Sequence, residues 1–279
     1  MEEKRIDLHT HTVCSDGSMT PRELVLHAKE SGLSAVAVSD HDTADGVKEA
    51  LAAGREFGVE VIPAIELSAK SDTETHILGY FIDPDSEALR QAVDYIRDVR
   101  TQRIGETCVM LAGHGIDVTL DEVKTIAGGG ILCRAHIARI MTDKGYSASP
   151  KAAFAEWLNV GCPCDSESQA LTDTEAVELI RKAGGDAYLA HLHLTKKPKD
   201  ELDAFVKRLT ESGLCGIEGW YTDYTPEMER EYRSLAAKYG LKLSGGTDFH
   251  GAFKPHIAIG RGTGGLSIPY SVLEEMKKR

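Results

Sequence analysis

The first residues that could do chemistry form a short stretch near the amino terminus, Asp7-Leu-His-Thr-His-Thr-Val-Cys-Ser-Asp16. His9 and His11 are two positions apart, so in an extended segment their side chains point to the same side. Two imidazoles followed by a carboxylate, Asp16, suit a divalent metal ion. A His-x-His pair also arises by chance at polar strand ends, and this stretch alone leaves the two interpretations about equal.

Further histidines and carboxylates repeat this pattern along the chain. Each ends or borders a short apolar run that is typical of a strand: His41, Glu66, His76, His191, Asp248 and His250. In a parallel α/β barrel the carboxyl ends of the strands meet at one mouth, where functional groups gather. Packing usually explains one such histidine, whereas the whole series predicts a metal site assembled from distant segments.

The elements that must position these residues alternate between strands and helices at both ends of the chain. Residues 4–82 are predicted to form strands and helices that end in a hairpin carrying His76, and the alternation resumes at residue 172. A last strand is expected around Ile257. Between them, residues 84–171 have only helical patterns. Roughly seven strand–helix units, interrupted once, favour a parallel α/β barrel over an open sheet.

The composition is that of an ordinary globular protein of 279 residues with a net charge of −12. This charge argues against binding to duplex nucleic acid or to an acidic membrane, but not against a small anionic substrate. The chain has no apolar run of about 18 residues and no signal-peptide core, so we expect no membrane span and a cytoplasmic location. The six cysteines are expected to be reduced thiols.

These motifs, taken in order, resemble those of the polymerase-and-histidinol-phosphatase (PHP) family. The resemblance rests on Asp7-Leu-His9-Thr-His11, Ser15-Asp16-Gly17, Ser39-Asp40-His41-Asp42, Glu66, His76, Ala190-His191 and Gly246-Thr-Asp248-Phe-His250. It implies an α/β fold, a distorted (β/α)7 barrel built from residues 1–83 and 172–279. It also implies that residues 84–171 form a helical subdomain that caps the substrate, and that the barrel carries a trinuclear metal centre.

The resemblance assigns a ligand set to each ion. One ion would take His9, His11, Glu66 and Asp248, a second would share Glu66 and add His76 and His191, and a third would take Asp16, His41 and His250. Mixed nitrogen and oxygen ligands suit Mn²⁺, Fe²⁺ or Zn²⁺ better than Mg²⁺ or Ca²⁺. We therefore expect three divalent ions as cofactors.

The chain departs from the family pattern after His191, where Leu192-His193-Leu194 replaces the usual proline and glycine. His193 could be an extra ligand, a general acid or a residue of the loop. We take it as a catalytic candidate together with Asp248 and His250.

Substrate contacts are expected from the insertion and from the barrel mouth. Arg134 and His136 begin a helix after three glycines, where backbone N–H groups favour an anion. Family members with this insertion use a similar Arg-x-His to hold phosphate oxygens. Lys196 could attract anions and Trp220 could stack on a nucleobase, although turn solvation and loop packing explain these two residues equally well.

Three arginines of the long insertion helix, Arg97, Arg100 and Arg103, recur at every third position. We expect them to form a solvated helix face rather than part of the site.

The expected function is a metal-dependent phosphoesterase in which a metal-bridging hydroxide attacks a small, nucleotide-like phosphomonoester such as a 3′,5′-bisphosphate. A cyclic phosphodiesterase or a 5′–3′ exonuclease on short oligonucleotides is the alternative. A carbon–nitrogen hydrolase would need a carbamylated lysine at a strand end, which the pattern lacks. A non-catalytic module is disfavoured because every ligand position is filled. Protein partners cannot be predicted.

Overall fold

The computed structural model describes residues 4–71, 73–159, 161–166 and 170–278. The strands are β1 (Arg5–Asp7), β2 (Leu33–Val38), β3 (Glu60–Ser68), β4 (His76–Tyr80), β5 (Asp186–Leu189), β6 (Gly216–Tyr221), β7 (Lys242–Gly246) and β8 (Ile268–Pro269). The barrel helices are α1 (Pro21–Glu30), α2 (Val47–Phe57), α7 (Asp173–Lys182), α8 (Lys199–Glu211), α9 (Pro226–Tyr239) and α10 (Tyr270–Lys277). The insertion contains α3 (Glu87–Gly113), α4 (Leu120–Ala127), α5 (Arg134–Asp143), α6 (Pro150–Ala153) and the π-helical turn η1 (Phe154–Leu158). Two 3₁₀ turns, η2 (Leu192–Thr195) and η3 (Gly251–Phe253), follow β5 and β7.

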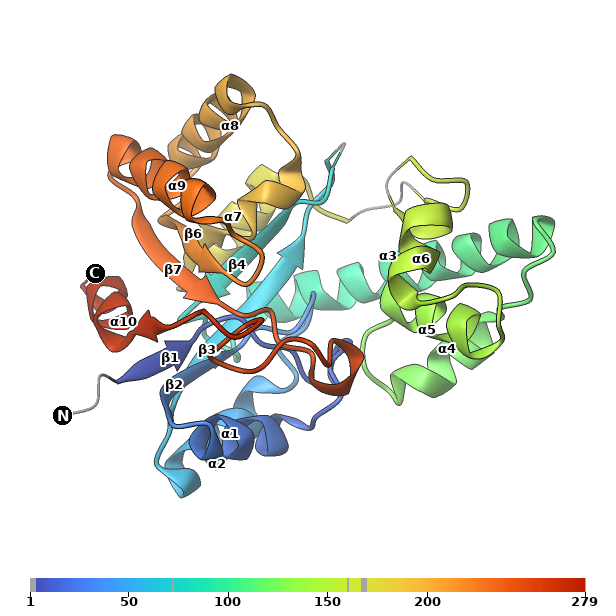
Figure 1. Cartoon of the computed structure of the whole chain (residues 1–279), viewed down its shortest axis with the longest axis horizontal. Coiled ribbons are helices and arrows are strands. Elements are labelled where there is room, and N and C mark those ends of the chain that lie inside the picture. Colours follow the sequence, from blue (N-terminus) through green and yellow to red (C-terminus); the bar gives the residue numbers. More distant parts are fainter. Residues whose placement is uncertain (1–3, 72, 160, 167–169, 279) are drawn as a thin grey trace.

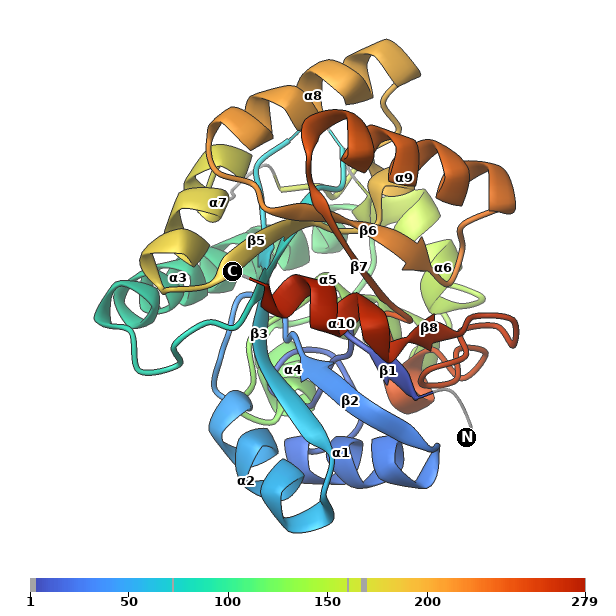
Figure 2. The same cartoon turned by 90° about the vertical axis from the view of Figure 1, so that its left-hand side faces the viewer.

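The eight strands form one sheet in the order β7-β6-β5-β4-β3-β2-β1-β8. The sheet curls until β7 meets the segment that follows β1, because Leu8 donates its N–H to the Gly245 carbonyl (3.1 Å) and Phe249 donates to that of His9 (3.3 Å). Figures 1 and 2 show the resulting nearly closed barrel with helices packed around its outside. The expected α/β barrel is confirmed.

The strand directions differ in part from a wholly parallel barrel. β4 runs antiparallel to both β3 and β5, and β8 runs antiparallel to β1. The reversal of β4 follows from the hairpin that joins it to β3, since a short connection can join only antiparallel strands. It brings the first residue of β4, His76, to the barrel end where β3 finishes.

The strands alternate between two apolar layers. Inward-facing residues such as Ile6, Ala64 and Tyr188 share one buried cluster with Leu273 and Met276 of α10. Helix α10 therefore closes the end of the barrel opposite to the strand ends that carry the histidines (Figure 2). The outward-facing residues pack against α1 and α2 on one side and against α7 and α8 on the other.

Local sequence signals explain where several helices begin. Thr20 caps α1 in a capping box with Glu23, and Pro21 lies in the first turn. Thr119 and Thr172 form the same reciprocal cap with Glu122 and Glu175 at the starts of α4 and α7. The prediction of a strand around Ile257 is wrong, because that residue lies among turns and β8 begins only at Ile268.

The insertion has a hydrophobic core of its own, which runs from Ile104 to Cys164 and excludes barrel residues. The first half of α3 instead packs on the barrel, since Leu89, Val93 and Ile96 belong to the cluster around α7 and α8. Helix α3 thus extends from the barrel into the insertion, which lies to one side of it (Figure 1). The predicted domain boundaries, 1–83, 84–171 and 172–279, stay an expectation.

None of the helices in the described part of the chain is long and apolar enough to cross a membrane.

We expect Gly246→Ala to open the seam between β1 and β7. A Cβ at Gly246 would lie 2.3 Å from the His9 Cβ and 2.4 Å from its backbone nitrogen. Overpacking of this kind costs about 1–3 kcal/mol, which urea unfolding measures. Gly113→Ala is the matched control, because a Cβ there meets nothing within 4 Å. Equal stability of the two variants would contradict the close approach.

Candidate metal centre

The structure brings all nine predicted ligands together at one end of the barrel. His9 and His11 follow β1, Asp16 lies in the next turn, and His41 follows β2. Glu66 continues the inward-facing series of β3, after Ile62 and Ala64. The remaining four come from β4 and from the segments after β5 and β7: His76, His191, Asp248 and His250.

The carboxylate of Glu66 lies at the centre of this group and is fully buried. Its Oε1 lies 3.0 Å from both His76 Nδ1 and His191 Nε2. Its Oε2 faces three more nitrogens: His9 Nε2 at 3.3 Å, His11 Nε2 at 3.4 Å and His41 Nδ1 at 2.9 Å. One carboxylate therefore presents a separate oxygen to each of two sets of imidazoles, which is the arrangement of a bridging ligand.

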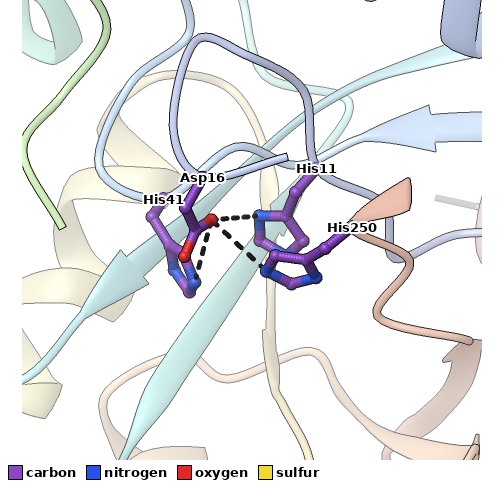
Figure 3. Close-up of side chains that lie close together, drawn as sticks. All are labelled: His11, Asp16, His41 and His250. Carbon is purple, nitrogen blue, oxygen red and sulfur yellow. Dashed lines mark ion pairs between the residues drawn. The ribbon is translucent and has the colours of Figure 1, made fainter. Parts of the chain in front are cut away.

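Asp16 is the centre of a second group on the other side of His11 and His41. Its Oδ1 lies 3.3 Å from His250 Nε2 and 3.9 Å from both His11 Nδ1 and His41 Nε2. Figure 3 shows the three rings turned toward this carboxylate. These four ligand atoms lie within 4.8 Å of one another, close enough to hold one ion.

Asp248 uses its two carboxylate oxygens differently. Oδ1 lies 3.2 Å from His11 Nε2 and 3.6 Å from His9 Nε2. Oδ2 accepts hydrogen bonds from the Tyr221 hydroxyl (2.9 Å) and the Lys254 ammonium (2.7 Å). Tyr221 and Lys254 therefore turn one oxygen of Asp248 toward the cluster.

Several polar atoms of the cluster lack hydrogen-bond partners, as expected for atoms that bind metal ions. Several of its buried polar atoms have no hydrogen-bond partner, among them His9 Nε2, both nitrogens of His11, Asp16 Oδ1 and Glu66 Oε2. A buried polar atom without a partner is costly, and native proteins seldom leave one. Ligand atoms held about 2.0–2.2 Å from an ion in tetrahedral geometry lie about 3.3–3.6 Å apart. The distances from Glu66 Oε2 to His9 Nε2 and His11 Nε2, 3.3 and 3.4 Å, lie in this range.

Two buried carboxylates outside the cluster hold its histidines, Glu218 through an imidazole and Asp7 through the backbone. Glu218 accepts a hydrogen bond from His9 Nδ1 (2.9 Å) and another from the His191 N–H (2.6 Å). Asp7 accepts from the backbone of His9, and from the backbone (2.9 Å) and hydroxyl (2.5 Å) of Thr247. A carboxylate paired with a ring nitrogen, as Glu218 is, fixes the tautomer and direction of a metal-binding histidine.

The pKa shifts within the cluster follow from burial and from opposed charges. Burial and the neighbouring His250 and His41 lower the pKa of His11 to about 3. Burial also opposes the charge on His41, but the carboxylates of Glu66 and Asp16 outweigh it and raise the pKa to about 9. Burial alone would raise the pKa of Glu66, yet the surrounding histidines hold it well below its usual value. The carboxylates stay charged and attract positive charge.

Strained backbone accompanies the site. Asp42, His191 and Asp248 adopt φ angles of 52°, 25° and 57°, a region that residues other than glycine seldom occupy. Such strain costs about 1–3 kcal/mol per residue and collects at functional sites.

The predicted substrate residues of the insertion lie at the start of α5. Arg134 Nη1 donates to the Leu158 carbonyl (2.7 Å) and lies 3.8 Å from Asp165. His136 accepts the N–H of Cys133 at Nδ1 (3.1 Å). His136 therefore caps the start of α5, and a hydrogen bond from the Ile131 N–H to the Cys14 carbonyl (2.9 Å) links this segment to the metal-ligand loop.

Three barrel residues predicted to act in catalysis or substrate binding, His193, Lys196 and Trp220, lie in different surroundings. His193 is half-buried with its ring 5.4 Å from those of both Tyr221 and Tyr224, and its Nδ1 has no hydrogen-bond partner. Lys196 is exposed after η2. The Trp220 ring lies under the Arg233 guanidinium at 4.0 Å, and the indole packs with the cluster that contains α10, so the structure does not bring it to the metal ligands.

The solvated helix face expected for Arg97, Arg100 and Arg103 is wrong for two of the three. Arg103 is buried and pairs with Asp165, and Arg100 forms a largely buried ion pair with Asp42. Helix α3 turns these two residues toward the barrel and the insertion core, and only Arg97 keeps an exposed pair, with Asp45.

Glu218 and Lys254 were not found by sequence reasoning. Glu218 lies in the otherwise apolar segment Gly216-Ile-Glu-Gly-Trp-Tyr221, and a carboxylate inside a buried strand was the available signal. No local pattern marks Lys254, because its partner Asp248 comes from the neighbouring turn.

Solved structures share this fold over nearly the whole chain. An amidohydrolase from Chromobacterium violaceum, solved with bound sulfate and no metal, superposes with a TM-score of 0.87 at 27% identity, over 98% of this chain and 96% of that one. A candidate metal-dependent phosphoesterase from Bifidobacterium adolescentis gives a TM-score of 0.86 at 28% identity, over 98% and 95% of the two chains. Barrel and cluster together define a metal-binding hydrolase.

The chain belongs to the PHP domain family, whose model matches residues 7–262. A 5′-3′ exoribonuclease from Haemophilus influenzae is 32% identical over 88% of this chain and 90% of the relative. A 3′,5′-nucleoside bisphosphate phosphatase from Chromobacterium violaceum is 30% identical, over 88% and 87%. A phosphoribosyl 1,2-cyclic phosphate 1,2-diphosphodiesterase from Eggerthella lenta is 29% identical, over 91% and 97%. The class of enzyme that these findings support is a hydrolase of phosphoric ester bonds.

We expect Glu66→Ala to lose more than one equivalent of metal and all turnover, because its two oxygens face two sets of imidazoles. Elemental analysis of the purified variant measures the loss. Glu231→Ala, at an exposed position of α9, is the control and should keep full metal content. Full occupancy in Glu66→Ala would show that Glu66 does not bridge.

Proposed function

We propose that this protein is a trinuclear metal-dependent phosphoesterase that hydrolyses a nucleotide-like phosphomonoester, for which a nucleoside 3′,5′-bisphosphate is the first choice. The observation that carries the proposal is the fully buried Glu66 carboxylate, with one oxygen facing two imidazoles and the other facing three. The bisphosphatase relative supports this substrate class.

Three ligand sets are proposed from the distances between ligand atoms. His9, His11, Glu66 and Asp248 would hold one ion, Glu66, His76 and His191 a second, and Asp16, His41 and His250 a third. His11 also lies within reach of the third set, through its Nδ1. Mn²⁺, Fe²⁺ and Zn²⁺ suit this mixture of imidazole and carboxylate ligands.

When bound, these ions would supply a nucleophilic oxygen at neutral pH and neutralise the charge on the phosphoryl group. The chain's own residues would position the substrate. The Arg134 guanidinium at the N-terminus of α5 would pair with phosphate oxygens, and His136 would cap that terminus by accepting the Cys133 N–H. His193, beside Tyr221, would donate a proton to the leaving oxygen.

A second function is supported by relatives of similar identity. The exoribonuclease and the cyclic phosphodiesterase match this chain about as well as the bisphosphatase does. A 5′–3′ exonuclease on short oligonucleotides, or a cyclic phosphodiesterase, is therefore the alternative. The expectations that the protein avoids duplex nucleic acid and membranes and is cytoplasmic stay predictions from composition.

A comparison of three substrates separates these functions. Mn²⁺-loaded protein is given a nucleoside 3′,5′-bisphosphate, a ribose cyclic phosphate and a short 5′-phosphorylated oligoribonucleotide, and kcat/KM is measured for each. We expect the bisphosphate to be preferred by at least about tenfold, a difference of about 1.4 kcal/mol. Preference for the cyclic phosphate or the oligonucleotide would replace the first function with the second.

We expect Arg134→Ala to lower kcat/KM roughly a hundredfold, since a charge-assisted phosphate contact contributes about 2–4 kcal/mol to transition-state stabilisation. Metal content should stay normal, because no metal ligand is changed. Arg139→Ala, on the same helix with its guanidinium paired to Asp143, is the control and should change kcat/KM little. Unchanged kinetics in Arg134→Ala would show that this side chain is structural.

We expect His193→Ala to lower kcat without loss of metal, by about 10²-fold or more if His193 is a general acid. The loss should shrink for nitrophenyl substrates, whose leaving group departs without protonation. His256→Ala, an exposed histidine, is the control. A fall in metal content would instead make His193 a ligand, and no change in any measurement would assign it to the loop.

A further inference from the structure

Arg100 in the middle of α3 joins three segments that are far apart in sequence. Its Nε donates to Asp42 Oδ2 (2.5 Å) and its Nη2 donates to the Ser68 hydroxyl (2.8 Å). Its Nη1 donates to the Leu132 carbonyl (3.0 Å) and lies 3.4 Å from Cys133 Sγ. One guanidinium therefore uses all three of its nitrogens to connect the barrel with the residues just before α5.

The barrel side of this contact belongs to the metal-ligand strand ends. Asp42 follows the ligand His41, donates its N–H to the Glu66 carbonyl (2.8 Å) and accepts the Ser68 N–H (2.8 Å). Ser68 is the last residue of β3, two positions after Glu66. Arg100 thus binds Asp42 and Ser68 where the segments that carry His41 and Glu66 are hydrogen-bonded to each other.

On the insertion side, Arg100 contacts the residues just before Arg134, which is proposed to bind phosphate. Leu132 and Cys133 directly precede Arg134, and Cys133 is the N-cap residue of α5. A second link from barrel to insertion lies close by, where Ile131 donates its N–H to the Cys14 carbonyl (2.9 Å). These two links lie within three residues of each other and directly before Arg134, so they set its position relative to the metal ligands. The Arg100 link is made by a side chain, and the Ile131 link is made by backbone atoms.

We propose that Arg100 is a positioning residue that holds the N-terminus of α5, and with it the Arg134 guanidinium, at a fixed place relative to the strand ends of His41 and Glu66. The proposal rests on the proposed function of Arg134. Arginine is required because a lysine has one ammonium and cannot reach Asp42, Ser68 and Leu132 together. Misplacing a substrate-positioning group by about 1 Å can cost a hundredfold in rate.

The experiment compares Arg100→Met and Arg100→Lys with Arg97→Met. Arg97 lies one turn earlier on α3 and also links the insertion to the barrel, but through an exposed pair with Asp45. We expect both Arg100 variants to lose roughly tenfold or more in kcat/KM at normal metal content, whereas Arg97→Met stays near wild type. Full activity of Arg100→Lys would overturn the proposal, because charge alone would then suffice.

A double-mutant cycle separates positioning from general destabilisation. If Arg100 acts through Arg134, adding Arg100→Met to Arg134→Ala should change kcat/KM by less than about threefold, because the residue being positioned is already gone. Multiplication of the two losses would overturn the proposal. If Arg134→Ala alone keeps wild-type kinetics, Arg134 does not bind phosphate, and the proposed role of Arg100 fails as well.

Hydrogen–deuterium exchange gives a readout that does not depend on turnover. The amides of residues 131–136 should exchange faster in Arg100→Met than in wild type, and at the wild-type rate in Arg97→Met. If no phosphorylated substrate is hydrolysed, the proposed function fails, but this measurement still decides whether Arg100 holds the segment. Unchanged exchange in Arg100→Met would overturn the proposal.

Discussion

A charged carboxylate without access to water is the constraint on which this structure depends. Glu66 is fully buried, and an unpaired charge in such a place would cost several kcal/mol. Five imidazoles surround it, and they come from four different segments of the barrel, with His9 and His11 sharing the segment after β1. The near closure of the barrel between β1 and β7 brings His9 and His11 to this carboxylate, and the reversed strand β4 brings His76 to it.

Residues around the cluster hold its ligands in place by hydrogen bonds. Glu218 orients the His9 imidazole and Asp7 holds the backbone of His9, while Tyr221 and Lys254 bind the second oxygen of Asp248. Several ligand atoms that face one another, among them His9 Nε2 and Glu66 Oε2, have no hydrogen-bond partner in the described structure. Cations suit this arrangement of imidazole and carboxylate atoms better than further protein groups would.

The sequence predicted the barrel and the nine cluster residues well, because each of these histidines and carboxylates lies at or near the end of a short apolar run that is visible in the local sequence. His9 and His11, for example, are neighbours on one side of an extended segment. Contacts between distant elements were harder to predict. The pattern of Arg97, Arg100 and Arg103 shows which residues share a helix face, but not that α3 turns that face toward Asp42 and Asp165. Trp220 follows the same logic, since only the packing of α9 reveals that its ring lies under Arg233.

Glu66, as a ligand shared between two ions, is the central feature of the proposed metal centre. Anomalous diffraction from crystals of Mn²⁺-loaded protein measures this directly. We predict three peaks at the barrel mouth, with one oxygen of Glu66 next to the ion of His76 and His191 and the other next to the ion of His9 and His11. A single peak, or peaks that leave either oxygen of Glu66 without an ion, would contradict the account.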